Sequence, residues 1–414
     1  MINPKAQMMC IDRAKYIDWF DASPIECCSR QAIEQIYISM VNGKSDKIAS
    51  LFSIIDFLYH TTDIEAKNLC EMFSFIDIWE YLSNQKLQKH AILCLSQVSN
   101  YKNHDFFSFI TYDHIDCVFG FLSSGDSDVV QSAELFLGNI CDYSSEFLFY
   151  VLNKGITKKL ELLDSSYNFS ILLINLLKEP NDYVESIVNL VSYVINSDDY
   201  ELISNGLHAL GRALHFSVQD KFSHLNDTIF EILNYHTERF LNLGDYEIQN
   251  FLYSCLCLVN SFPEHLARII IQNLKKDKDN SFIIGIQLLE SKKDSLSSDC
   301  LIDLYSIIND RISSLSYIQQ KRVLFSFFNL FSNSTEFSPT IVDTLLKFAN
   351  DTEIGSAALG FFANICVRHV DSPDFCHYIS EFETISQELI GSSSEESQIQ
   401  IQRLSGFLKF GQDL

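Results

Sequence analysis

Apolar residues recur along most of this chain at the three- and four-residue spacing of amphipathic helices, and short polar turns interrupt them. The segment AILCLSQVS from Ala91 and the segment AELFLGNIC from Ala133 both place apolar side chains on one helix face. Each segment is followed by polar residues and then by another amphipathic run. The pattern therefore predicts a series of helix hairpins.

The same short pattern returns along the chain. Further copies begin at Gly206, Val323 and Ala358, and weaker ones at Phe169, Ser254 and Ser281. The seventh residues of the copies serve as markers, and they are Gln97, Asn139, Asn175, Arg212, Asn260, Gln287, Asn329 and Asn364. Their intervals are 42, 36, 37, 48, 27, 42 and 35 residues. The mean of about 38 lies close to the period of about 40–47 residues in armadillo and HEAT repeats, and the interval of 27 suggests that one weak copy is misplaced.

One such hairpin exposes too much apolar surface to be stable alone, and stacked neighbours bury that surface in a continuous core. Prolines such as Pro263 and Pro339 precede amphipathic runs, as expected for helix starts. We therefore predict an all-α fold, a right-handed α-solenoid of armadillo/HEAT-type helical repeats. A single array of roughly nine to ten units is expected over residues 1–414, with an N-terminal cap over 1–30 and a loop and capping helix over 391–414.

The segment from Ala133 to Leu163 resembles the armadillo repeat of importin-α, the adaptor family that recognises nuclear localisation signals. The matching residues are Leu137, Gly138, Asn139, Ile140, Val151, Leu152, Gly155, Leu160, Leu162 and Leu163. The segment from Val323 to Leu346 is similar to the later repeats of that family. The resemblance implies that Gly155 supplies the sharp turn between a short first helix and a longer second helix.

In importin-α, a Trp and an Asn four residues apart on each third helix line a concave groove that holds an extended peptide. The Asn amide fixes the peptide backbone, and the Trp rings hold the aliphatic stems of lysines. Carried over to this sequence, the resemblance implies a peptide-binding site formed by Asn139, Asn175, Asn260, Phe325, Asn329 and Asn364. The alternative is that each Asn caps a helix or bonds locally.

The chain departs from the family at the Trp position, which holds Leu93, Leu135, Ile171, His208, Leu256, Ile283, Phe325 and Gly360. Phe325 with Asn329 is the remaining aromatic–amide pair, and Arg212 would place a positive charge where a basic peptide should run. Trp19 and Trp79 lie outside the third-helix frame and are expected in the core or in a cap. Lys5, Arg13 and Lys15 are too few to match the basic N-terminal segment of importin-α.

The chain has 30 Lys and Arg against 54 Asp and Glu, a net charge of −24. This charge disfavours nucleic acid and membrane surfaces as partners and favours a basic protein or peptide. The alternative is that the acidity only keeps a long helical surface in solution.

Most of the 12 cysteines lie in apolar helical runs, as Cys94, Cys141 and Cys366 do, and read as small core residues. Neither a signal peptide nor a stretch of 18 apolar residues is present, so the cytoplasm or the nucleus is the expected compartment. Metal-finger spacing is absent, and so are the common catalytic motifs; Gly43-Lys44-Ser45 lacks the upstream glycine of a phosphate-binding loop. We expect no cofactor, no metal and no enzymatic activity.

Two functional hypotheses remain. The first is an adaptor that holds an extended segment of another protein in a concave groove, including the case of a divergent importin-α-like nuclear import receptor. The second is a scaffold or regulatory subunit that binds folded partners without a linear-peptide groove. The sequence does not identify the partner or the oligomeric state.

Overall fold

The computed structural model describes residues 29–73, 75–101, 104–217, 220–332, 338–369, 372–389 and 395–411. Every regular element within these residues is a helix, and none of them forms a strand. The predicted all-α solenoid is confirmed. The chain divides into two compact units, unit 1 (Met1–Phe216) and unit 2 (Ser217–Leu414). That the chain forms one uninterrupted array stays a prediction.

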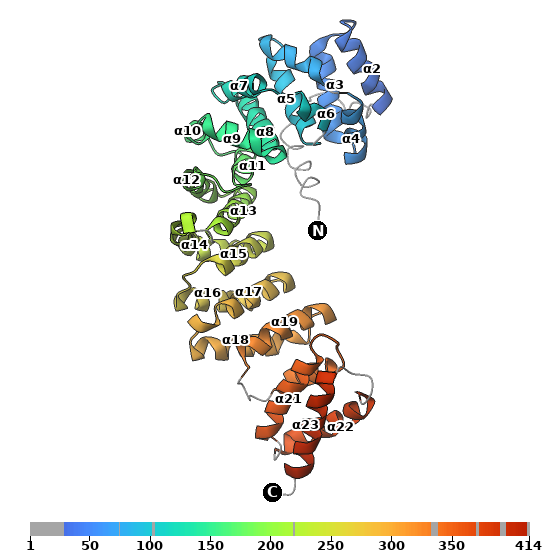
Figure 1. Cartoon of the computed structure of the whole chain (residues 1–414), viewed down its shortest axis with the longest axis vertical. Helices are drawn as coiled ribbons and strands as arrows, with labels where there is room; N and C mark the ends of the chain where they lie inside the picture. Colours follow the sequence, from blue (N-terminus) through green and yellow to red (C-terminus); the bar gives the residue numbers. More distant parts are fainter. Residues whose placement is uncertain are drawn as a thin grey trace. The chain divides into compact units, whose positions relative to one another are not determined.

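The helices of unit 1 follow one another in short antiparallel steps (Figure 1). They are α2 (Arg30–Val41), α3 (Lys47–His60), α4 (Asp63–Met72), η1 (Ile76–Ser83), α5 (Gln88–Ser99), α6 (His104–Ser108), α7 (Tyr112–Phe121), α8 (Ser127–Tyr143), α9 (Ser145–Asn153), α10 (Ile156–Leu160), α11 (Tyr167–Leu176), α12 (Val184–Ile195) and α13 (Tyr200–Phe216). Helices α3, α5, α8, α11 and α13 pack each on the next. They are the third helices of successive repeats.

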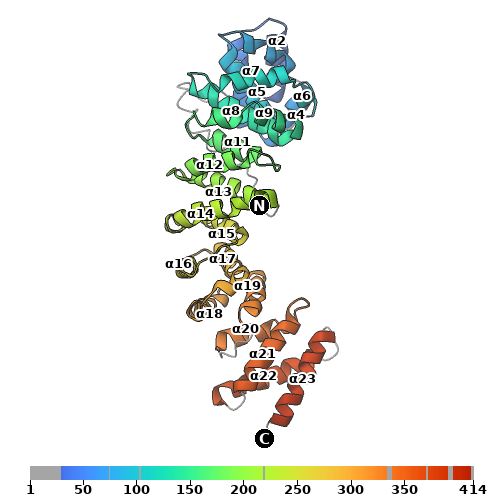
Figure 2. The ribbon, with the colours of Figure 1, turned by 60° about the vertical axis from the view of Figure 1, so that its left-hand side comes forward.

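The helices of unit 2 form two layers, which Figures 1 and 2 show as successive hairpins. They are η2 (Asp220–Phe222), α14 (His224–Asn242), α15 (Tyr246–Leu258), α16 (Glu264–Leu274), α17 (Asp279–Ser291), η3 (Lys293–Ser295), α18 (Ser298–Ile312), α19 (Tyr317–Leu330), α20 (Pro339–Lys347), α21 (Gly355–His369), η4 (Pro373–Phe375), α22 (Cys376–Leu389) and α23 (Glu395–Gly411). One layer contains α14, α16, α18, α20 and α22, and the other contains α15, α17, α19, α21 and α23.

Small residues allow the third helices of unit 1 to approach closely. A Cβ on Gly138 of α8 would lie 3.4 Å from Leu172 Cα and 3.5 Å from Asn175 Nδ2 of α11. A Cβ would therefore already be in van der Waals contact with α11, and a side chain longer than that of alanine would push α11 away. The pattern GNI in the sequence therefore has a packing role at this step of the stack.

Gly155 adopts the left-handed conformation predicted for a sharp turn, with φ at +85° between α9 and α10. The prediction of a short first and a longer second helix is wrong, because α9 has 9 residues and α10 has 5. Helix α10 is short because its last turn tightens: the amides of Leu162 and Leu163 bond to carbonyls only three residues back.

Phenylalanine fills much of the core. Phe327 and Phe331 of unit 2 contact the ring of Tyr305, and Phe327 also meets Phe361 of the next repeat. Pro339 begins α20, so this proline marks a helix start as expected.

Cys94, Cys141 and Cys366 are fully buried, as predicted, and Trp79 is a core residue with its indole stacked on the imidazole of His114. Lys5, Arg13, Lys15 and Trp19 lie outside the described residues, as do 391–394 of the predicted C-terminal loop. Helix α23, which follows that loop, packs on α21 as the last helix of unit 2.

Candidate functional site

The marker residues are the candidate site. All of them except Asn260 lie on the third helices of unit 1 or, in unit 2, on α17, α19 and α21, which we also call third helices. Asn260 lies two residues beyond the end of α15, where it is exposed, and its backbone N–H donates to Asn226 Oδ1 at 2.7 Å. The copy behind the short interval of 27 residues is therefore out of register with the third helix. Asn260 does not lie on one helix face with the other markers.

In unit 1 the markers bond to the preceding repeat. The Asn139 amide donates to Ser99 Oγ and to Asn100 Oδ1, both at 2.8 Å. The amide of Asn175 is buried and donates to the carbonyl of Gly138 at 3.0 Å. These amide hydrogens hold successive third helices in register.

Arg212 continues this series one repeat further. Its guanidinium donates to the carbonyl of Ile174 at 2.8 Å, and burial lowers its pKa although Asp142 lies near enough to oppose the shift. The positive charge expected in a peptide groove is thus directed into the helix stack.

Unit 2 contains an equivalent bond that the marker frame missed. The ammonium of Lys292, one residue after α17, donates to the carbonyl of Cys257 at 3.0 Å and to that of Val259. Burial lowers the pKa of Lys292. A cation here caps the carbonyls at the C-terminal end of α15.

Later third helices leave their markers exposed. Ile318, Arg322, Phe325 and Asn329 of α19 follow one another at intervals of four, three and four residues, and all four are exposed. Ile318 is 72% and Phe325 46% accessible, which is high for large apolar side chains. Asn364 on α21 is exposed as well. We call these five residues the α19–α21 face.

One contact and one comparison with other repeats qualify this face. The amide of Asn329 donates to a carboxylate oxygen of Glu290 on α17, so its orientation is fixed. At the Trp position, Leu93, Leu135, Leu256 and Ile283 are buried. Phe325 is therefore exposed where these equivalent side chains belong to the core.

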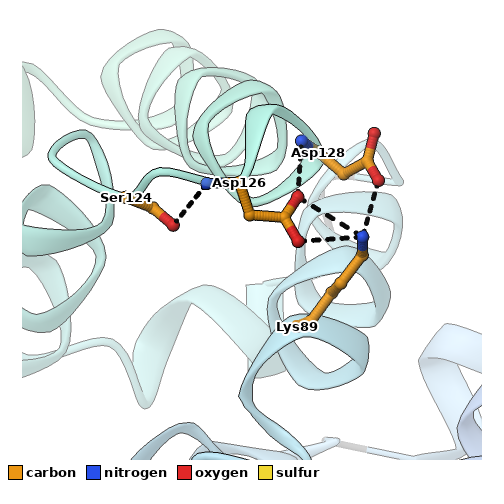
Figure 3. A network of polar contacts seen from close by, with 4 residues as sticks. All are labelled: Lys89, Ser124, Asp126 and Asp128. Carbon is orange, nitrogen blue, oxygen red and sulfur yellow. Dashed lines mark hydrogen bonds and ion pairs between the residues drawn. The ribbon is translucent and has the colours of Figure 1, made fainter.

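Polar contacts at helix starts also align the repeats. Figure 3 shows the ammonium of Lys89, on α5, between the carboxylates of Asp126 and Asp128 at the start of α8, at 3.0 and 2.7 Å. Burial disfavours the charged form of Asp126, but hydrogen bonds from Lys89 and from the Asp128 amide outweigh it and lower its pKa. This network fixes α8 on α5.

Two buried carboxyl groups have raised pKa values. Burial raises the pKa of Glu134, on α8, to about 7, although the Ser166 hydroxyl donates to it at 2.6 Å. In unit 2 burial raises the pKa of Asp277 to about 6, against hydrogen bonds from Tyr253 and Asn273. Glu134 lies between α8 and the start of α11, and Asp277 lies in the turn between α16 and α17; both are buried within their unit.

Among the described residues, no cluster of three or more His, Cys, Asp or Glu side chains is arranged to hold a metal ion. The described part of the chain also contains no helix that is long and apolar enough to cross a membrane.

No family model and no curated protein matches this sequence. Among solved structures, an engineered protein from the Northeast Structural Genomics Consortium is similar with a TM-score of 0.64 and 17% identity, over 92% of this chain and 99% of that one. A designed armadillo repeat protein in complex with the peptide (KR)4 has a TM-score of 0.44 and 14% identity, over 57% of this chain and 100% of that one. The first likeness supports the fold, and the second is too distant to add to it.

Proposed function

We propose that the chain is a non-catalytic protein-binding adaptor that holds an extended segment of another protein along the α19–α21 face. The observation that carries this proposal is the exposed stripe of Ile318, Arg322, Phe325 and Asn329 on one third helix. An exposed aromatic ring offers contact area at little cost in side-chain entropy, and a neighbouring amide can pair with a peptide backbone.

The predicted peptide-binding residues contribute unequally in this proposal. The exposed Phe325, Asn329 and Asn364 would contact the bound segment directly. Asn139 already donates both of its amide hydrogens within the stack, so a bound segment could use only its oxygen. Asn175 is buried and donates to the carbonyl of Gly138, so it would contact a bound segment little. Asn260, beyond α15, would lie at the margin of such a site.

The net charge of −24 favours a basic segment as the ligand. The charge acts over the whole surface, so it would speed association more than it would select one sequence. Specificity would then depend on the apolar and amide contacts of the α19–α21 face.

Selection from a phage library of random dodecapeptides tests this function without a known partner. We expect enrichment of linear, basic sequences on the wild-type protein. The double variant N329A/N364A should bind the selected peptides with a free energy weaker by about 1–3 kcal/mol, as expected for lost hydrogen bonds. N189A, an exposed Asn on α12, is the matched control. If no peptide is enriched, or if the double variant binds as tightly as the control, the adaptor proposal is wrong.

A nuclear import receptor is the narrower form of this proposal, and it places the protein in the cytoplasm and the nucleus. It requires a linear nuclear localisation signal as the bound segment. Its test is nuclear accumulation of a fluorescent cargo that carries a selected peptide, in permeabilised cells supplied with this protein. Accumulation that does not depend on the protein would restrict the function to binding.

A scaffold for folded partners is the second candidate. The side chains of Asn139, Asn175 and Arg212 donate hydrogen bonds to the preceding repeat. These third helices of unit 1 therefore offer few donors to an extended peptide, which favours a scaffold. A scaffold would give no enriched peptides in the selection above.

A further inference from the structure

Unit 1 exposes a group of aromatic side chains away from its third helices. Phe109, Tyr112 and Phe149 are 45%, 42% and 41% accessible. Tyr112 begins α7, Phe109 lies in the turn before it, and Phe149 is on α9 of the next repeat. With Phe147 and Tyr150 of α9 they form what we call the aromatic edge.

Contacts between α7 and α9 hold Tyr112, Phe147 and Tyr150 in place. The rings of Tyr112 and Tyr150 stack with centroids 4.2 Å apart, and Phe147 meets Tyr112 edge-on at 6.4 Å. The Tyr112 hydroxyl donates to a carboxylate oxygen of Glu146. These three rings are therefore oriented before any ligand arrives, which reduces the entropy lost on binding.

Negative charge surrounds the rings. The Tyr150 hydroxyl donates to Asp116 Oδ1 at 2.8 Å, and Lys154 donates to the other oxygen of that carboxylate at 2.8 Å. Glu146 and Asp113 add two further carboxylates, and Asp113 is exposed beside Tyr112. Among the described residues named here, the rings have three carboxylates and one ammonium group near them, and that ammonium group, of Lys154, lies 5.7 Å from the centroid of the Tyr150 ring.

We propose that the aromatic edge is a docking surface for an arginine-containing segment of another protein. A guanidinium group stacks on Tyr and Phe rings and pairs with carboxylates in the same plane, whereas a lysine ammonium group does so less well. Exposed aromatic rings surrounded by carboxylates match that chemistry. The surface lies on α7 and α9, so the inference is independent of the α19–α21 face.

The test compares two peptides of equal length and charge, (Arg-Gly)5 and (Lys-Gly)5, in a binding titration with the full chain. Stacking predicts that the arginine peptide binds about threefold more tightly. Equal affinity would mean that charge alone attracts both peptides, and the proposal would be overturned.

Alkylation of Cys117 localises the binding. This cysteine on α7 is exposed one helical turn after Asp113, and Cys376 in unit 2 is exposed as well. The arginine peptide should slow the alkylation of Cys117 and leave the rate at Cys376 unchanged. Mass spectrometry measures both rates. Equal protection of both cysteines, or of neither, contradicts docking at the aromatic edge.

Variants complete the test. F149S and D113N should each abolish the preference for the arginine peptide, because one removes a ring and the other a carboxylate. The matched control is Y193S, which replaces a 70% accessible ring on α12 of the same unit. F325S should leave the protection of Cys117 unchanged whether or not the adaptor proposal holds. If F149S behaves as the control does, or if the protein dimerises in sedimentation through this edge, the assignment is wrong.

Discussion

The buried carboxyl of Glu134 should make the stability of unit 1 depend on pH. Its side chain is 1% accessible, and burial raises its pKa from 4.5 to about 7. The folded unit therefore holds a proton that the unfolded chain releases above pH 4.5. Stability then falls as the pH rises from about 4.5 to about 7, and it stays low above that range.

The variant E134Q removes the charge and keeps an oxygen for the hydroxyl of Ser166. With 1.36 kcal/mol for each tenfold change, the pKa rise corresponds to about 3 kcal/mol of stability lost at pH 8 and about 1 kcal/mol at pH 5.5. We expect E134Q to be more stable than the wild type by roughly these amounts at the two pH values.

Urea unfolding followed by tryptophan fluorescence measures this difference. Trp79 is buried in unit 1, so the change in its fluorescence reports on that unit. The control E161Q removes an exposed carboxylate and accounts for the general relief of charge repulsion. Equal stabilisation by E134Q and E161Q at both pH values would refute the reasoning.

Three further predictions concern packing and hydrogen bonds. G355A should destabilise unit 2 by about 1–3 kcal/mol, because a Cβ there would lie 2.6 Å from a backbone oxygen. At Gly360 a Cβ has space, so G360A should stabilise α21 by up to about 1 kcal/mol. Urea unfolding followed by circular dichroism compares the two variants, and equal effects would contradict the packing. N175A should cost about 1–3 kcal/mol in unfolding followed by tryptophan fluorescence, because it removes a buried hydrogen bond between α11 and α8 together with the packing of the side chain. A change below about 0.5 kcal/mol would show that this bond is not needed. Y253F removes a hydrogen-bond donor to Asp277 and should raise the pKa of that carboxyl further. The loss of stability should therefore be larger at pH 8 than at pH 5.5, and an equal loss at both pH values would exclude this linkage.

The repeat period was sufficient to predict the fold, because each hairpin must bury the same helix face at the same spacing. The turn at Gly155 was predictable for a similar reason, since only glycine adopts that backbone conformation at low cost. The lengths of α9 and α10 were not, because the final turn of α10 tightens in a way that depends on local hydrogen bonds.

The candidate site was less predictable. The sequence identifies Asn139 and Asn175 as amides at a regular spacing, but it does not say whether their hydrogens meet a ligand or the preceding repeat. That outcome depends on where the carbonyls of the neighbouring helix lie, which only the packed structure gives. Lys292 was missed because the marker frame followed amides; its distance of 329 − 292 = 37 residues from Asn329 was the signal that could have found it.

The bonds from Asn139, Asn175 and Arg212 to the preceding repeat also bear on how such a protein can evolve. Each donor has a different acceptor. The short amide of Asn175 donates to the carbonyl of Gly138, whereas the longer guanidinium of Arg212 donates to the carbonyl of Ile174. A repeat duplicated or moved elsewhere in the gene would carry its donor to a neighbour with another acceptor. The repeats of this chain are therefore not interchangeable, because each donor depends on the acceptor that the preceding repeat provides.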